Sequence, residues 1–169
     1  MATPIVSAYI GLGANIEEPI KQLQHAVTAL NQHADISVTQ CSRIYCSAAY
    51  GVTDQDDFFN AVIEVSTSLS AIGLLNVLID QELEQGRVRE RHWGPRCIDL
   101  DLLCYHNETW CSNTLVLPHP GIALRRFVLL PLQELAPQFA LNQKTIETLI
   151  EDCEPQQLHV VNDLALSIA

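Results

Sequence analysis

The 169-residue chain contains no hydrophobic run approaching the ~20 residues that a membrane-spanning helix requires. Its first residues lack the basic stretch and the apolar stretch of a secretory signal peptide. It also contains no Cys-x-x-Cys pair, so its six cysteines predict reduced, mostly buried thiols rather than a zinc site or disulfides. We therefore expect a cytoplasmic protein without a membrane partner.

Positive charge is scarce in this chain. Nine Lys and Arg residues stand against 20 Asp and Glu, which gives a net charge of −11. An acidic protein repels the phosphate backbone of nucleic acids, so we expect no nucleic-acid partner. Hydrophobic residues make up 48 % of the chain, which excludes a disordered polar chain. The length predicts one domain over residues 1–169, and we expect a monomer.

The order of the predicted elements indicates the fold class. Alternating or continuous apolar residues predict strands at 5–12, 36–45, 58–65 and 98–105. A helix is predicted to begin at Pro19, and a second one to run from the N-cap Ser70 to Gln85, where Gly86 ends it. This βαββαβ order is typical of the ferredoxin-like α+β fold, with a mainly antiparallel sheet and helices on one face.

The few cations of the chain are concentrated in two places. Seven of the nine are arginines; four of them lie between Arg87 and Arg96, and Arg125 and Arg126 form a second group. Arginine pairs with phosphate oxygens two at a time, so the pattern favours a site for one polyvalent anion. A solvated basic loop is the alternative. Trp93 lies in the first group, where it would be either a core anchor or a lid residue that stacks on a ligand.

Two carboxylates begin the strand predicted at 98–105. Asp99 and Asp101 share one strand face, with Cβ atoms roughly 7 Å apart by strand geometry. Like charges this close favour a divalent cation between them, and Mg²⁺ takes one or two carboxylates together with phosphate oxygens. Two ions about 4 Å apart could share such a pair. A solvated strand end or Asp–Arg ion pairs are the alternatives.

Other local patterns point to a ligand less strongly. Phe58 and Asn60 share the non-core face of their strand, which suits a flat heterocycle with hydrogen-bonding edges, although an ordinary surface would look the same. Gly11 and Gly13 resemble a phosphate loop without its third glycine. Glu82 lies at the edge of the apolar stripe expected on the second helix, where a carboxylate needs a cation or ribose-like hydroxyls as partners. The residues expected in that stripe are Ile72, Leu75, Leu78, Ile79 and Leu83.

Two sequence blocks resemble the 6-hydroxymethyl-7,8-dihydropterin pyrophosphokinase family, over about residues 9–137. The more specific block is Gly86-Arg-Val-Arg followed by Trp93-Gly-Pro-Arg-Cys-Ile-Asp-Leu-Asp101. The second is Pro118-His119-Pro120 with Arg125, Phe127 and Pro131-Leu132. The resemblance implies an enzyme of folate biosynthesis that transfers a pyrophosphoryl group from ATP to the hydroxymethyl group of the reduced pterin and releases AMP.

The resemblance also implies a role for individual residues. Asp99 and Asp101 would bind two Mg²⁺ ions, and Arg87 and Arg96 would be catalytic. Leu102 would pack near the adenine of ATP. The residues implied in ATP binding are Glu82, Arg87, Arg89, Trp93, Arg96, Leu102, His119 and Arg125, and those implied in pterin binding are Ser47, Ala48, Tyr50, Phe58, Asn60 and Phe127.

The chain departs from the family pattern in its pterin loop. The family's usual Thr-x-Pro-x-Gly is replaced here by Ser-Ala-Ala-Tyr-Gly at residues 47–51. Two alternatives therefore remain: a divergent paralogue that uses another hydroxyl acceptor, and a non-catalytic ferredoxin-like ligand-binding module. The intact carboxylate pair with Arg96 argues against the second.

Overall fold

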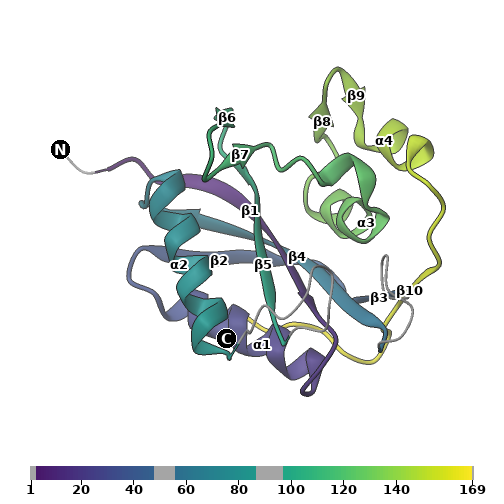
Figure 1. Ribbon diagram of the computed structural model, residues 1–169, viewed down its shortest axis with the longest axis horizontal. Coiled ribbons are helices and arrows are strands. Elements are labelled where there is room, and N and C mark those ends of the chain that lie inside the picture. The colour runs from purple at the N-terminus through teal and green to yellow at the C-terminus, as the bar shows by residue number, and fades with distance from the viewer. Residues whose placement is uncertain (1–2, 48–55, 87–96, 169) are drawn as a thin grey trace.

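The computed structural model describes residues 3–47, 56–86 and 97–168, and β1 (Val6–Ala14) is an inner strand of its six-stranded sheet. Antiparallel strands β4 (Phe58–Thr67) and β5 (Asp99–Tyr105) flank β1 on its two sides (Figure 1). On the far side of β4 lie β2 (Ile36–Cys41) and β3 (Tyr45–Ser47), and β10 (Leu158–Val160) pairs with β3. This arrangement confirms the ferredoxin-like α+β expectation.

Two of the expected strands differ from the observed ones. β1 continues through Ala14, so Gly11 and Gly13 are strand residues and the phosphate-loop interpretation is wrong. The strand expected at 36–45 is divided into β2 and β3. The division falls at Ser42, whose Oγ accepts the Val62 N–H at 2.9 Å in place of a backbone carbonyl. A side chain that supplies a ladder acceptor lets the backbone bend there.

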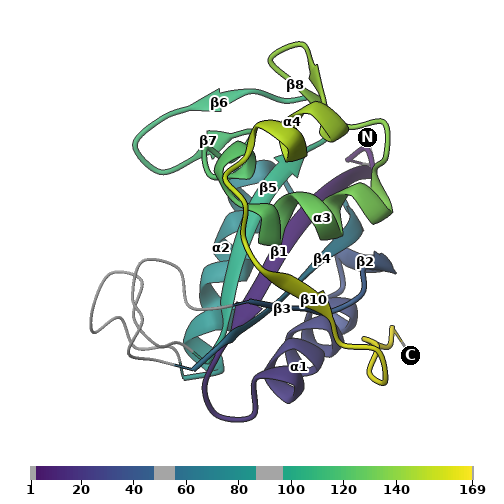
Figure 2. The ribbon, with the colours of Figure 1, turned by 90° about the vertical axis from the view of Figure 1, so that its right-hand side faces the viewer.

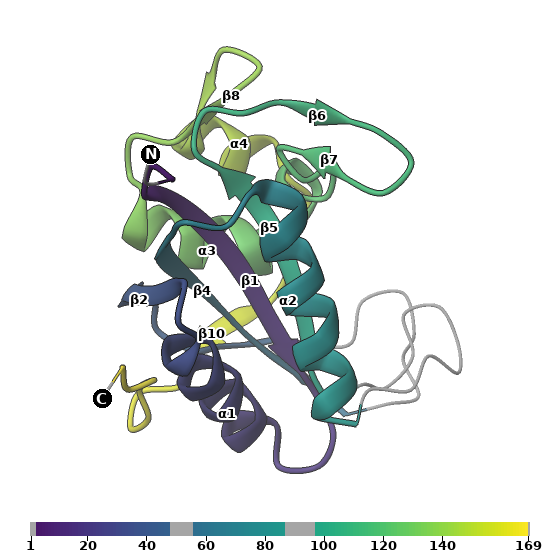
Figure 3. The same cartoon turned by 90° about the vertical axis from the view of Figure 1, so that its left-hand side faces the viewer.

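Helices cover both faces of the sheet, where the sequence predicted only one. Helices α1 (Pro19–Gln32) and α2 (Ala71–Glu84) lie on one face (Figure 3), and α3 (Arg126–Leu135) lies on the other (Figure 2). In the described parts of the chain, no helix is long and apolar enough to cross a membrane.

The remaining elements are short. A 3-10 turn (Ile122–Leu124) leads into α3, and α4 (Ile146–Asp152) packs on α3. There are also two small hairpins. One pairs β6 (Trp110–Cys111) with β7 (Val116–Leu117) before the 3-10 turn, and the other pairs β8 (Ala140–Leu141) with β9 (Lys144–Thr145) between α3 and α4.

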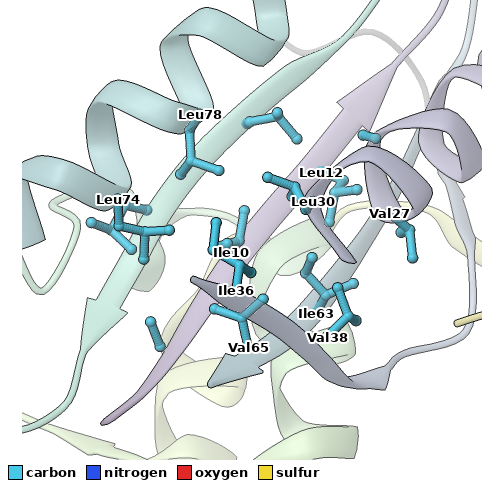
Figure 4. Close-up of a cluster of buried hydrophobic side chains, with 14 of the residues drawn as sticks. Ile10, Leu12, Val27, Leu30, Ile36, Val38, Ile63, Val65, Leu74 and Leu78 are labelled. Carbon is cyan, nitrogen blue, oxygen red and sulfur yellow. The ribbon is translucent and has the colours of Figure 1, made fainter. Parts of the chain in front are cut away.

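Each face of the sheet has its own apolar cluster. The larger one lies between the sheet and α1 and α2, with Ile10, Leu30, Ile63 and Leu74 among its members (Figure 4). The smaller one lies under α3 and includes Val62, Leu103, Ile122, Leu129 and Leu132. The strands are therefore buried on both sides, which is why β4 is apolar at consecutive positions.

The ends of α2 are as the sequence predicted, but its buried face is not. The Ser70 Oγ accepts the Gly73 N–H at 3.0 Å, and Gly86 ends the helix with φ +85°. Of the expected stripe only Leu78 is fully buried; Ile79 is 42 % exposed and Leu83 64 %. The helix instead buries Ala71, Leu74, Leu78, Gln81 and Glu82. Apolar residues occur nearly all round its first turns, so periodicity alone does not select a face.

A β-bulge changes the alternation of β5. Ile10 pairs with Leu102 while Tyr9 pairs with Cys104, so Leu103 has no partner on β1. After the bulge Cys104 faces α3 and Tyr105 faces the α1 and α2 side, the reverse of what strict alternation from Asp99 would give. The Tyr105 hydroxyl donates to the Leu69 carbonyl at 2.6 Å.

Candidate active site

The sheet face under α3 collects the described residues of the predicted pterin and metal sites. Strand register places Tyr45, Asn60, Gly13 and Asp99 in one row across β3, β4, β1 and β5. Register partners point to the same face of a sheet. Asn60 and Asp99 therefore lie on either side of Gly13, which has no side chain.

Asn60 is buried and has an unsatisfied hydrogen-bond donor. Its side chain is 6 % exposed, and its Nδ2 finds no hydrogen-bond partner among the described residues. Buried amides are satisfied in the great majority of cases, so an orphaned one marks a place where a ligand supplies the partner. Ser47 and Phe58 pair directly beside it, on β3 and β4. This environment fits a ring with a polar edge.

Asp99 and Asp101 lie on β5 with both carboxylates half-buried. Asp101 Oδ2 is 4.0 Å from Nη1 of Arg125, the residue that precedes α3. The described residues contain no group of three or more His, Cys, Asp and Glu side chains suited to a metal. Two carboxylates open to solvent are the donors that Mg²⁺ combines with waters and phosphate oxygens, so the residues present fit this ion.

Arg125 connects the carboxylate pair with the aromatic side of the site. Besides its ion pair with Asp101, its guanidinium carbon lies 5.9 Å from the ring centre of Phe127, in the first turn of α3. The cation therefore lies within reach of a phosphate group bound at the carboxylates. The Phe127 ring packs partly against the cluster under α3.

His119 lies near Arg125 and Asp99 and is held as a neutral ring. Its backbone N–H donates to the Leu103 carbonyl at 2.8 Å, and its Nδ1 accepts the Gly121 N–H at 2.9 Å. Burial, and after it the nearby Arg125 charge, lower the pKa of His119, and the Asp99 charge acts in the opposite direction. Since Nδ1 accepts, the hydrogen of the neutral ring is on Nε2, which can donate to a ligand.

The predicted nucleotide contacts Glu82, on α2, and Leu102, on β5, lie at the outer edge of the sheet. Glu82 is 5 % exposed, and its Oε1 accepts the Leu100 N–H at 2.7 Å. The Leu102 side chain is 3 % exposed in the core on the opposite face and does not reach the carboxylates. Its backbone groups, two residues after Leu100, point to the same outer edge, where an adenine could pair with them.

Several predicted residues lie outside the described part of the chain. These are Ala48, Tyr50, Arg87, Arg89, Trp93 and Arg96. The described residues on either side of the arginine-rich stretch lie together, because the Cys97 Sγ donates to the Gln85 carbonyl at 3.2 Å. Gln85 and Cys97, which flank the stretch in sequence, are therefore in direct contact.

Sequence reasoning missed Gly13, Tyr45 and Glu134. An isolated glycine in a strand is a known sign of close approach, and Gly13 has that pattern. No sequence signal joins Tyr45 to Glu134, since 89 positions separate them; yet the Tyr45 hydroxyl donates to Oε1 of Glu134, and the Arg43 N–H donates to Oε2 at 2.9 Å.

Comparison with known proteins identifies relatives over most of the chain. A family model described as 7,8-dihydro-6-hydroxymethylpterin-pyrophosphokinase (HPPK) matches residues 9–137. A protein of Methylorubrum extorquens named 2-amino-4-hydroxy-6-hydroxymethyldihydropteridine pyrophosphokinase is 40 % identical over 154 residues, which cover 91 % of this chain and 98 % of the relative. A protein of the same name from Bacillus subtilis is 42 % identical over 141 residues, covering 83 % and 84 %.

Solved structures share the fold at low sequence identity. A crystal structure of an HPPK-DHPS in complex with substrates aligns with a TM-score of 0.70 at 14 % identity, over 88 % of this chain and 43 % of that one. A Plasmodium falciparum HPPK-DHPS with pteroate aligns with a TM-score of 0.68, over 88 % and 42 %. This chain thus spans about two fifths of those longer proteins, and the likeness supports the fold.

Proposed function

The chain belongs to the 7,8-dihydro-6-hydroxymethylpterin-pyrophosphokinase family, and we propose from this premise how its residues divide the work of the reaction. It is a transferase of folate biosynthesis that moves a pyrophosphoryl group from ATP to the hydroxymethyl group of 6-hydroxymethyl-7,8-dihydropterin and releases AMP. The observation that carries the assignment of residues is the row in which Asn60 and Asp99 flank Gly13 on one sheet face.

The pterin would bind on the β3 and β4 side of that row. The amide of Asn60 offers a donor and an acceptor to the pyrimidine-like edge of the ring, and its unpaired Nδ2 supports this role. Phe58 and Phe127 would stack on the two ring faces, from β4 and from α3. Ser47, with Ala48 and Tyr50, would complete the pocket. The hydroxymethyl group would then extend toward β5.

The triphosphate would lie on the β5 side. Asp99 and Asp101 would hold two Mg²⁺ ions, which when bound neutralise phosphate charge and orient the phosphate oxygens. Arg125 and the Nε2–H of His119 would contact the same oxygens. The backbone edge at Leu102 would pair with the adenine, and Glu82 would keep that edge in place through the Leu100 N–H.

The transfer needs positioning and charge neutralisation more than covalent help from the protein. The pterin hydroxyl attacks the β-phosphorus, and AMP leaves from the opposite side. Arg87 and Arg96 would stabilise the charge that develops on the transferred group, and Arg89 and Trp93 would close over the nucleotide. Exclusion of water would prevent hydrolysis of the pyrophosphoryl group.

We also propose a cytoplasmic location. All six cysteines are free thiols and four of them are buried, as is typical of proteins from reducing compartments. Fractionation of the source cells with an antibody against this chain tests the location directly.

The function is tested by incubating the purified protein with ATP, Mg²⁺ and the hydroxymethyl dihydropterin. We expect AMP and the pterin diphosphate to form in equal amounts. Reactions without the pterin, and reactions of Asn60→Ala, are the controls and should form little AMP. ATP binding without AMP formation would contradict the function. AMP formation with another hydroxyl compound, but not with the pterin, would favour the divergent paralogue.

A further inference from the structure

Gly13 leaves the space that the Asn60 side chain occupies. A Cβ atom added at Gly13 would lie 2.8 Å from Oδ1 of Asn60, closer than real Cβ atoms approach another atom. Apart from Gly13 and its two chain neighbours, no other atom of the described residues lies within 4 Å of that position, except Cγ of Asn60 at 3.9 Å. The close contact therefore concerns the Asn60 amide alone.

Tyr45 bounds Asn60 on the side away from Gly13. The two residues are direct register partners on β3 and β4, so their side chains are neighbours on one face. The Tyr45 hydroxyl donates to Glu134, in the last turn of α3, and the same carboxylate accepts the Arg43 backbone N–H. The hydroxyl is therefore engaged by α3 rather than by Asn60, whose Nδ2 stays unpaired.

We propose that Gly13 and the Tyr45–Glu134 pair are positioning residues that hold the Asn60 amide in its ligand-reading orientation, an inference that rests on the proposed pterin site. Gly13 allows the amide to lie across β1. Glu134, through its bond with the Tyr45 hydroxyl, holds the Tyr45 ring in place beside the amide. A buried amide without a partner is unfavourable in the free protein, and its preset orientation removes the cost of ordering it when a ligand binds.

The inference predicts a loss that is specific for the pterin. In Gly13→Ala the added methyl group must displace Oδ1, so we expect the affinity for a pterin analogue to fall about tenfold, the range of one lost buried hydrogen bond. The affinity for a non-hydrolysable ATP analogue should stay within about twofold, because the ATP contacts are on β5 and around His119. Calorimetric titration with each ligand gives both values.

Gly11→Ala is the matched control. Gly11 lies on the same strand and the same face, two residues earlier. The three atoms nearest to its added Cβ would all belong to the Leu103 side chain, at 3.5 to 3.7 Å, which is ordinary contact. We expect this variant to bind the pterin analogue like the wild type. An equal loss of pterin affinity in Gly11→Ala and Gly13→Ala would mean a general effect of alanine in β1 and would overturn the proposal.

A double-mutant cycle separates positioning from a merely structural role. If Gly13 acts only through Asn60, Gly13→Ala causes no further loss of pterin affinity in a protein that already carries Asn60→Ala. Additive losses would overturn the proposal. Tyr45→Phe tests the other side while keeping the ring, and we expect about a threefold loss of pterin affinity with ATP affinity unchanged. The Tyr45→Phe variant also tests the proposal if Gly13→Ala does not fold.

Unchanged pterin affinity in a folded Gly13→Ala or Tyr45→Phe would overturn the proposal while the proposed function stands, since the wild type binds the pterin in the same experiment. A wild-type protein that does not bind the pterin analogue would overturn the proposed function and this inference with it.

Discussion

At the scale of single residues, the groups that surround a polar side chain determine whether its position and its protonation are fixed. Asp101 is partly exposed, and its ion pair with Arg125 is long, at 4.0 Å. His119 is the opposite case, because two hydrogen bonds fix its position and its protonation. The two residues therefore respond to different tests.

Asp101→Asn should abolish turnover and leave the fold intact. The substitution removes one of two metal-binding charges, while the partly exposed ion pair with Arg125 contributes at most about 1 kcal/mol to stability. AMP formation with Mg²⁺ and a thermal melt measure the two effects. Asp152→Asn, which removes an exposed carboxylate paired with Lys144 at 2.7 Å, is the control and should keep full activity. Near wild-type turnover in Asp101→Asn would refute the metal assignment.

Acid should destabilise the protein through His119. The pKa of His119 is lower in the folded state than its ordinary value of about 6.5. At a pH between the two values, the His119 ring is protonated in the unfolded chain and neutral in the folded chain. The stability contributed by neutral His119 is complete above pH 6.5 and is lost as the pH falls below it. Thermal melts from pH 7.5 to 5.5 should show a smaller decrease for His119→Asn than for the wild type.

The control for this experiment is His159→Asn, because His159 is exposed on β10. This variant should follow the wild-type pH dependence. A His119→Asn variant that loses as much stability as the wild type over the same range would show that other groups cause the acid sensitivity.

At the scale of elements, α2 and α3 show that a helix face is chosen by its neighbours. α2 buries Gln81 and Glu82 and exposes Leu83, because Glu82 bonds to β5 and Gln81 donates to Oε1 of Gln85 at 2.8 Å. Satisfied polar groups can thus displace leucine from a buried face. α3 brings Phe127 and the adjacent Arg125 to the sheet face that carries Asn60 and Asp101.

The orientation of α2 is tested by comparing two leucines. Leu74→Ala should lower the free energy of unfolding by about 2–5 kcal/mol, since it empties a fully buried position. Leu83→Ala should change it by less than about 0.5 kcal/mol, because that side chain is mostly exposed. Urea unfolding of the two variants measures both. The reverse order would mean that α2 buries the face expected from the sequence.

Phe127→Ala should weaken pterin binding by about 1–3 kcal/mol, the range for stacking of a base on an aromatic ring, with ATP affinity nearly unchanged. The melting temperature should also fall, because the ring packs partly against the cluster under α3. Phe139→Ala removes a ring from the same cluster and serves as the control: it should lower the melting temperature and spare both affinities. Equal weakening of both ligands by Phe127→Ala would refute the stacking assignment.

At the scale of the whole molecule, charge and layer arrangement work together. The net charge of −11 gives the molecule a field that repels polyanions, so the arginines and the Mg²⁺ ions of the proposed site would have to offset that field. Helices also pack against both faces of the sheet and make it rigid (Figure 2, Figure 3). A rigid sheet suits a site whose residues lie on neighbouring strands and depend on the strand register for their alignment.

The protein should be a monomer in solution. Its net charge repels a second copy, and its exposed large apolar side chains are distributed over several elements, including Ile5, Leu83 and Leu124. Sedimentation at two protein concentrations and two salt concentrations should report the 18.8 kDa monomer throughout. A dimer that grows with concentration and survives low salt would contradict this and would direct attention to the exposed side of α2.

The sequence by itself determined the order of the main elements, the ends of α2 and the shared strand face of Asp99 and Asp101. Ser70 and Gly86 act through bonds within a few residues, and Asp99 and Asp101 share a strand face by local geometry. Such features depend on neighbours along the chain, so the order of residue types is sufficient to predict them. The two blocks that resemble the pyrophosphokinase family were sufficient for the function for the same reason.

Only the tertiary structure decided how these parts meet. The bulge at Leu103, the second helix layer and the buried face of α2 each depend on contacts between distant segments. The space that Gly13 leaves for Asn60 has the same origin, because β1 and β4 pair across 47 positions of sequence. Packing against distant neighbours outweighs local preference at such places, since burial and hydrogen-bond satisfaction are settled only when the layers close.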